Sequence, residues 1–308
     1  MSGPGIFNLV LTSPPRISPT NHFPIWIESV WRDDDGTMYG WYHHEPKGMC
    51  GGKLTAPEIG ALLSTDNGDS FQDLGIVLSS GDQVNCRAQN GFFAGGHGDF
   101  SVVLDHDRQY FYFLFGNYGG SAANQGIGMA RMAFGDRASP VGAVYKLSNG
   151  KWAASGIGGE LSPILPARRD WSLSDTDSFW GPAIHWNTSI ERYVVLLNRA
   201  CCKSGWPQEG IYAMFGQDLS DPATWTAPAK ILSASQIGFA PGYYPQVAGT
   251  GPGETDTIAG QLPRMFIKGV SKWQIYFAFP EPQEPQDPEE PPSNPYPQNL
   301  EDRGSRRH

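Results

Sequence analysis

The sequence predicts an all-β protein, a β-propeller built from four-stranded blades. The chain of 308 residues has 38 Gly and 12% aromatic residues, but only 17% charged residues. Tight turns need glycine and strands favour aromatic side chains, so this composition is typical of a β-rich protein. A strand–turn–strand pattern also recurs four times, and a second hairpin follows each of the first three copies. Four strands per repeat indicate the blades of a propeller.

Each repeat begins with a polar or aromatic residue, continues as an apolar strand and turns into an aromatic-rich strand. The turns carry Asp, Asn, Gly and Thr, as hairpins require. A two-sheet sandwich also gives alternating strands, but it does not naturally repeat a whole four-strand module. The repeats cover residues 28–42, 99–114, 180–197 and, more weakly, 244–277. The second hairpins pair 59–64 with 71–77, 126–132 with 142–145, and 210–215 with 225–231.

The predicted propeller domain covers residues 6–280, and residues 281–308 form a Pro- and Glu-rich tail that we expect to be disordered. Such a segment buries too little apolar surface to fold and favours extended polyproline-type conformations. The net charge of −9 argues against a nucleic-acid partner or an anionic membrane surface. No apolar run is long enough for membrane insertion. The N-terminus does not have the form of a signal peptide, so an extracytoplasmic location would require a truncated N-terminus.

Two local motifs bear on the first repeat. Residues 64–71, Ser-Thr-Asp-Asn-Gly-Asp-Ser-Phe, match the Asp-box pattern S-x-D-x-G-x-x-[WF], a hairpin turn in which the Asp caps the backbone and the aromatic residue packs beneath it. Residues 55–58, Thr-Ala-Pro-Glu, have the form of a helix capping box. The strand pattern that follows favours a strand over a helix at residues 59–64.

The four cysteines have no spacing typical of a zinc site. Cys50 and Cys86 pair if the chain meets an oxidising compartment, and the alternative is that all four are free thiols. Neighbouring residues such as Cys201 and Cys202 rarely bond to each other, because the geometry is strained.

Carboxylates at the repeat starts are the candidate catalytic groups. The first strand of each propeller blade lines the central channel, so its first residues gather around one pocket. Here those residues are Glu28, Asp99 and the group 177–180. Carboxylates that meet in one pocket shift each other's pKa values, and two of them suffice for glycoside hydrolysis. The alternatives are a turn-capping role for Asp99 and a salt bridge of Glu28 with Arg87 or Arg199.

Three of these strands resemble motifs of the five-bladed carbohydrate-active propellers that include arabinanases, β-xylosidases and invertase-type fructosidases. Residues 28–30 resemble the strand that holds the base, and residues 98–101 resemble the strand whose carboxylate orients substrate. Residues 180–182, Trp-Gly-Pro, resemble the strand of the acid, but Trp180 stands where the acid is expected. The resemblance covers most of residues 25–277 and implies five blades. Either residues 6–12 complete a fifth blade or the chain is shortened.

The resemblance implies a glycoside hydrolase that acts on an oligosaccharide or polysaccharide, and we expect the chain to be a monomer. Glu28 is then the base, Asp99 orients the substrate, and Asp177 or Glu209 replaces the acid. The alternatives are a carbohydrate- or protein-binding propeller without the acid, and a structural scaffold that uses only the rim. No cofactor is required, and a structural cation on the axis is one role for a histidine. Candidate substrate-binding residues are Trp26, His97, Trp180, His185, Trp206 and Tyr244.

Overall fold

The computed structural model describes residues 14–19, 21–238 and 243–279. The described residues up to Phe277 belong to one compact unit. The segment 6–12 proposed for a fifth blade and the tail 281–308 both lie outside the described residues. Within the part of the chain that is described, no helix has the length and apolar character needed to cross a membrane.

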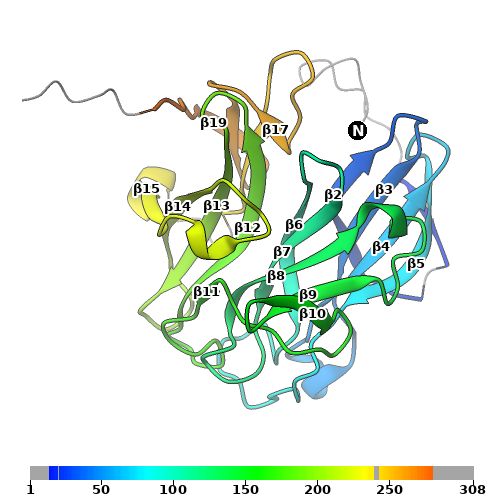
Figure 1. Ribbon diagram of the computed structural model, residues 1–308. Coiled ribbons are helices and arrows are strands. Elements are labelled where there is room, and N and C mark those ends of the chain that lie inside the picture. The colour runs from blue at the N-terminus through cyan, green and yellow to red at the C-terminus, as the bar shows by residue number, and fades with distance from the viewer. Residues whose placement is uncertain (1–13, 20, 239–242, 280–308) are drawn as a thin grey trace, which may run out of the picture. The chain divides into compact units, whose positions relative to one another are not determined.

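Four β-sheets follow one another along the chain, and their arrangement confirms the predicted propeller (Figure 1). The first sheet has the order β1-β5-β4-β3-β2, with β1 parallel to β5 and the other pairs antiparallel. A four-residue 3-10 helix, Met49–Gly52, follows its strand β3. The strands are β1 (Arg16–Ser18), β2 (Ile25–Arg32), β3 (Met38–His44), β4 (Glu58–Ser64) and β5 (Ser70–Leu78).

The second sheet repeats the same meander in the order β10-β9-β8-β7-β6, and the short strand β11 pairs with β8. A 3-10 helix, Phe134–Asp136, follows β8. The strands are β6 (His97–Leu104), β7 (Tyr110–Asn117), β8 (Gly126–Ala133), β9 (Val144–Ser148), β10 (Lys151–Ser155) and β11 (Leu165–Pro166).

The third sheet has the order β15-β14-β13-β12-β17, with β17 parallel to β12, and the fourth has the order β16-β18-β19. The strands of the third sheet are β12 (Asp177–Asn187), β13 (Arg192–Cys201), β14 (Gln208–Gly216), β15 (Ala229–Ser233) and β17 (Ile258–Ala259). The fourth sheet contains β16 (Pro245–Ala248), β18 (Arg264–Ile267) and β19 (Val270–Gln274). The 3-10 helix Pro222–Thr224 and helix α1 (Ala234–Ile237) flank β15.

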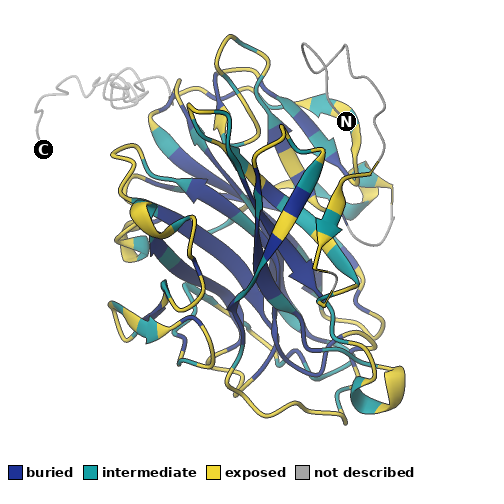
Figure 2. Ribbon diagram, turned by 90° about the vertical axis from the view of Figure 1, so that its right-hand side faces the viewer, coloured by how far each residue is buried: buried dark blue, intermediate teal, exposed yellow. Residues whose placement is uncertain are grey.

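The core lies between consecutive sheets, because alternate residues of one strand face opposite neighbours. In β7, Phe111 and Phe113 pack against Trp41 of the first sheet, whereas Tyr112 and Leu114 belong to the cluster shared with the third sheet. The alternate residues of β13 divide in the same way, between the cluster shared with the second sheet and the cluster shared with the fourth. Figure 2 shows the buried strands in the middle of the fold and the exposed residues mostly in the connections.

The structure agrees with most of the predicted strands. The pair 59–64 and 71–77 forms β4 and β5, so a strand rather than a helix follows the capping-box pattern. The predicted strand 225–231 is shifted, because the 3-10 helix at 222–224 delays β15 until Ala229. The fourth sheet has three strands among the described residues instead of four, and a fifth blade is not seen in this part of the chain.

The turn between β4 and β5 is held by side chains of the Ser64–Phe71 motif. Ser64 Oγ donates to Asp66 Oδ1 at 2.8 Å, and the Ser70 amide donates to the same oxygen at 2.8 Å. Gly68 has a φ of +90°, which a side chain would disfavour. Phe71 lies buried below the turn.

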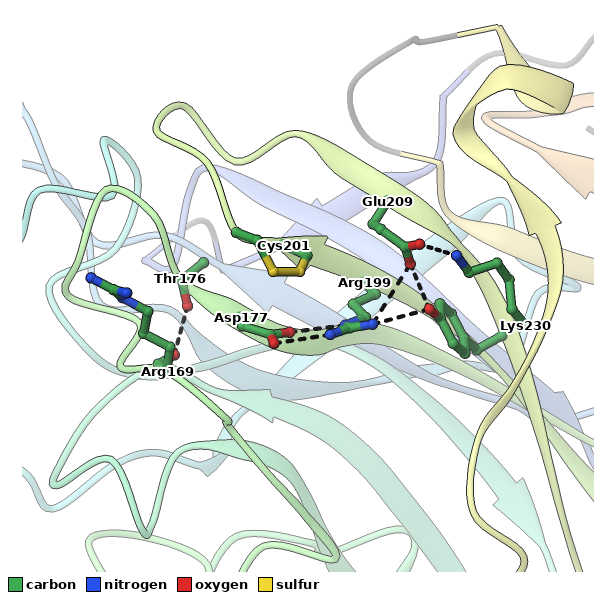
Figure 3. Close-up of a disulfide and its surroundings, with 9 residues drawn as sticks. Arg169, Thr176, Asp177, Arg199, Cys201, Glu209 and Lys230 are labelled. Atoms are coloured by element: carbon green, nitrogen blue, oxygen red, sulfur yellow. Dashed lines mark hydrogen bonds and ion pairs between the residues drawn. A yellow bond between two sulfur atoms is a disulfide. The ribbon is translucent and has the colours of Figure 1, made fainter.

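Both cysteine pairs are joined in the structure. Cys50 and Cys86 form a disulfide that links the 3-10 helix after β3 to the connection before β6. Cys201 and Cys202 also form a disulfide, so the expectation that these neighbours would stay apart is wrong. Their bond closes the C-terminal end of β13 (Figure 3).

Candidate functional site

Irregularities in the inner strands position the candidate residues. In β2 the pairing register shifts across Glu28, in β6 across Asp99, and in β12 across Gly181 and Pro182. A bulge leaves its extra residue out of the hydrogen-bond ladder and re-aims the side chain. The bulges of β2 and β6 therefore present carboxylates, whereas the bulge of β12 presents none.

These three bulges and the start of β16 surround one cavity of about 230 Å³. We call it the axial pocket, since residues from all four innermost strands or their starts line it. Glu28 and Asp99 are the charged residues among its described lining. The full lining is Ile27, Glu28, Asp99, Phe100, Ser101, Gly181, Pro182, Ala183, Tyr244, Pro245 and Gln246.

Asp99 is held by two tyrosine hydroxyls. Tyr244 donates to Oδ1 at 2.8 Å, and Tyr118 donates to Oδ2. Burial and then the Asp99 charge raise the pKa of both tyrosines, so both remain protonated donors. Asp99 is itself buried and has a φ of +45°, a conformation that costs energy for a residue with a side chain. Such strain is typical of a functional position.

Glu28 meets Asp99 beside His43 of β3. The Phe100 amide donates to Glu28 Oε2 at 2.8 Å, and Glu28 Oε1 lies 3.4 Å from His43 Nδ1. Burial raises the pKa of Glu28 above its ordinary value, and the Asp99 charge adds to this against the opposing effect of His43. Glu28 therefore keeps its proton to a higher pH than a free glutamate does. Its contact is to a histidine, and not to Arg87 or Arg199.

His43 lies between two glutamates. Its Nε2 is 3.5 Å from Glu45 Oε1, on the side opposite Glu28. Burial would lower the pKa of His43, but hydrogen bonding to the two glutamates raises it to about 10. The Asp99 amide nitrogen lies 3.1 Å from Nδ1, so Glu28 and the backbone of Asp99 meet at the same ring nitrogen.

One atom each of Glu28, His43 and Asp99 lies within 4.8 Å of the other two, a spacing that also suits a metal ion. Three of the four carboxylate oxygens accept hydrogen bonds, from Tyr118, Tyr244 and the Phe100 amide, and the fourth, Glu28 Oε1, faces His43. The second such group in the described part of the chain is Asp177 with Cys201 and Cys202, whose sulfurs are joined to each other.

Asp177 and Glu209, the two candidates for the acid, do not line the axial pocket. Figure 3 shows both carboxylates beside Arg199. Asp177 accepts two hydrogen bonds from Arg199, at 2.9 Å each. Glu209 accepts from Lys230 and, at 2.5 Å, from the Tyr212 hydroxyl. Burial would raise the pKa of Glu209, but Lys230 and Tyr212 outweigh it and lower the pKa. A lowered pKa is the opposite of what a general acid needs.

The aromatic candidates divide into exposed and buried groups. Trp26 is 49% exposed and packs edge-on against His43, and Tyr244 is 48% exposed beside Asp99. Trp180 is buried, and its Nε1 donates to Gln208 at 2.9 Å. Trp206 is buried among aromatic rings that include Phe92. Tyr244 lines the axial pocket, whereas Trp26, Trp180 and Trp206 do not.

The two candidate histidines do not line this pocket. His185 lies on β12 beside a narrow cavity of about 20 Å³, and burial lowers its pKa to about 3. His97 lies at the start of β6 and lines a different cavity.

Sequence reasoning missed Tyr118 and Glu45 as members of the site. Tyr118 follows the strand that pairs with β6, and Glu45 follows His43 and His44 at the end of β3. Both residues directly follow the strand that pairs with an inner strand, β7 in one case and β3 in the other, and this position in the sequence could have marked them as site residues.

Comparison with known proteins finds similarity only among solved structures. No protein-family model and no curated protein matches the chain. An exo-1,5-α-L-arabinanase from a bovine ruminal metagenomic library is 13% identical, with a TM-score of 0.45 over 85% of this chain and 80% of that one. An endo-arabinase from Bacteroides thetaiotaomicron is 13% identical, with a TM-score of 0.44 over 82% of this chain and 74% of that one.

An α-L-arabinanase from Cellvibrio cellulosa, solved with arabinohexaose, is 12% identical, with a TM-score of 0.35 over 64% of this chain. The chain spans about half of that protein, 53%, and half of a structure from the family of mannoside phosphorylases, 50%. These neighbours are β-propeller glycoside hydrolases, the group that the three strand motifs resemble.

Proposed function

We propose that the protein is a carbohydrate-active propeller that binds a neutral glycan in the axial pocket and hydrolyses its glycosidic bond. The observation that carries this proposal is the convergence of Glu28 and Asp99, from two different sheets, in one pocket. Tyr244, which lines this pocket, provides an aromatic face of the kind on which sugar rings stack. The described lining holds no lysine or arginine, which disfavours an anionic sugar.

The geometry assigns roles that differ from those expected from sequence. Glu28 has the raised pKa that a proton donor needs, so it protonates the leaving oxygen. Asp99, fixed by two tyrosine hydroxyls, is the carboxylate that faces the anomeric carbon and forms the glycosyl bond. Water, deprotonated by Glu28, then releases the sugar and restores both groups. Neither Asp177 nor Glu209 is needed.

The spacing of the pair predicts the stereochemical outcome. Inverting enzymes hold their carboxyl groups about 6.5–9.5 Å apart to admit a water, whereas retaining enzymes hold them about 5–5.5 Å apart. The nearest Glu28 and Asp99 oxygens lie within 4.8 Å. This leaves less room for a water than inversion needs, so we expect hydrolysis with retention, and NMR of the first-formed anomer checks it.

A screen of nitrophenyl glycosides of arabinose, xylose and mannose, together with plant oligosaccharides, tests the proposal. Activity is expected on at least one, and Asp99→Asn should reduce kcat/KM by several orders of magnitude, because an amide cannot act as the nucleophile that forms the glycosyl bond. Glu191→Gln, an exposed carboxylate on the β12–β13 turn, is the matched control. Unchanged activity in Asp99→Asn would refute the role of Asp99.

A binding protein without catalysis is the second candidate. It is favoured by the β12 bulge, which holds Gly181 and Pro182, and by Trp180, which is buried where the resemblance places the acid. Calorimetric binding of an oligosaccharide that is never cleaved would support this candidate. Turnover that depends on Glu28 and Asp99 would reject it.

A further inference from the structure

Glu45 does not line the axial pocket, but the imidazole of His43 lies between it and Glu28. Glu28 Oε1 lies 3.4 Å from His43 Nδ1, and Glu45 Oε1 lies 3.5 Å from Nε2. These separations are longer than those of strong hydrogen bonds, so the attraction between opposite charges dominates both contacts. Glu45 therefore acts on Glu28 through the position and the charge of His43.

The His43 ring is buried and confined by the two inner strands beside it. Trp26 of β2 packs edge-on against it, with ring centroids 5.8 Å apart. On the side of β6, a Cβ on Gly98 would lie 2.6 Å from His43 Cε1, so the glycine leaves the room that the ring occupies. A ring held in this way carries its charge at a fixed point beside Glu28.

Carboxylates from three elements keep the His43 ring charged at neutral pH. They are Glu28 of β2, Asp99 of β6 and Glu45, which directly follows β3. Burial would lower the pKa of His43, but its contacts with the two glutamates and the Asp99 charge outweigh burial and raise the pKa to about 10. The hydroxyls of Tyr118 and Tyr244, which donate to Asp99, keep their protons because burial and then the Asp99 charge raise their pKa values.

Glu45 differs from the other two carboxylates because it takes no part in the proposed reaction. During that reaction Glu28 loses and regains its proton, and Asp99 becomes a neutral ester when it forms the glycosyl bond. Glu45 lies toward the solvent instead, with a side chain that is 34% exposed and lines a cavity of about 500 Å³ together with Lys47 and Lys53. It is therefore the partner that His43 keeps through every step.

We propose that Glu45 is a positioning residue that acts through His43, holding the charged imidazole beside Glu28 and so setting the pH range in which Glu28 gives up its proton. This inference rests on the proposed function, because it gives Glu45 a part in the work of Glu28. The His43 charge opposes the effect of burial on the pKa of Glu28. Loss of that charge, or of its position, therefore raises the pKa of Glu28 further.

The test uses Glu45→Gln in the full chain, which removes the charge and keeps the shape of the side chain. NMR of the His43 imidazole nitrogens against pH should show a titration midpoint lower by about one pH unit or more. The alkaline limb of the pH profile of kcat/KM, measured on a substrate from the glycoside screen, should move to higher pH, because the proton donor keeps its proton longer. Glu191→Gln, which removes the same charge elsewhere, should move neither.

An unchanged His43 midpoint overturns the proposal, and so does a lowered midpoint with an unmoved alkaline limb. Glu45→Asp, which keeps the charge, should shift both less than Glu45→Gln does, and it gives the same test if Glu45→Gln does not fold. The NMR titration needs no turnover. A lowered midpoint in a protein that hydrolyses no substrate would reject the catalytic function and with it this role of Glu45. Hydrolysis with an unchanged midpoint would reject the role of Glu45 alone.

Discussion

At the scale of single residues, the axial pocket joins two carboxylates in unlike surroundings. Asp99 receives hydroxyl donors on both oxygens, whereas Glu28 is buried beside a second negative charge. Burial and the neighbouring Asp99 charge raise the pKa of Glu28, and such a raised pKa is how a carboxyl group becomes a proton donor. The pair was predictable from its place at the repeat starts, but its division of roles was not, because it depends on Tyr118 and His43.

The raised pKa of Glu28 predicts that Glu28→Gln stabilises the fold at neutral pH. Ionising a group whose folded-state pKa is raised costs stability, and each tenfold change in proton affinity is worth about 1.4 kcal/mol. This cost is absent below about pH 4.5, the ordinary value, and grows as the pH rises toward the folded pKa. Thermal unfolding should therefore show a higher Tm for the variant at pH 7 and no difference at pH 4. A gap that widens on acidification would contradict the burial of an ionisable Glu28.

Tyr118→Phe tests the bond that fixes Asp99. Removing a hydroxyl that donates to a buried carboxylate is expected to lower the free energy of unfolding by about 1.5–3 kcal/mol. Tyr145, whose side chain is 44% exposed on β9, is the matched control, and Tyr145→Phe should change it by less than about 0.5 kcal/mol. Urea unfolding of both variants is the measurement. Equal stabilities would show that Asp99 does not depend on Tyr118.

At the scale of elements, alternation and turn residues predicted strands well, because both are local properties. The bulges could not be predicted, because no feature of the neighbouring sequence marks Glu28 or Asp99 as a residue left out of the hydrogen-bond ladder. Asp177 is an example of a residue whose role was predicted wrongly because the pairing of its strand was not known. It begins an inner strand, as expected, but it pairs in register with Cys201, where Arg199 on the same neighbouring strand captures its carboxylate. The ion pair with Arg199 of β13 therefore makes Asp177 a structural residue in this fold.

Close packing between β3 and β4 predicts a severe effect of one methyl group. A Cβ on Gly60 would overlap the ring of Tyr42, which is buried and donates to Asp73 at 2.8 Å. Gly60→Ala should therefore lower the free energy of unfolding by about 1–3 kcal/mol. Gly135→Ala, where a Cβ would meet nothing within 4 Å, should change it by less than about 0.5 kcal/mol. Chemical denaturation compares the two, and similar values would reject the steric argument.

At the scale of the whole molecule, the sequence repeats correctly predicted the order of the sheets along the chain. The hydrophobic clusters between consecutive sheets explain why neighbouring repeats pack against each other. Each middle strand carries large apolar residues on both faces, so a sheet is stable only between neighbours. The number of strands in the last sheet could not be predicted in the same way. There the pattern is weak, and β17 leaves the fourth sheet's segment to pair with β12.

The Cys50–Cys86 bond is expected to contribute strongly to global stability. It closes a loop of 36 residues, for which loop-closure entropy gives about 4 kcal/mol. The Cys201–Cys202 bond, between adjacent residues, restricts the unfolded chain far less. Replacing Cys50 and Cys86 by Ser should therefore lower Tm much more than replacing Cys201 and Cys202. Calorimetric scans of the two double variants are the check, and the opposite order would exclude loop entropy as the main source.

The three bulges of β2, β6 and β12 have an evolutionary consequence. A bulge residue makes no ladder bond, so replacing Glu28 or Asp99 removes a carboxylate while the strands on either side keep their pairing. The bulge of β12 is less free to change, because Gly181 has a φ of +56° and a Cβ there would lie 2.7 Å from Asn198. A single substitution at β2 or β6 could therefore turn a hydrolase of this kind into a binding protein, whereas an acid at Gly181 would strain the backbone.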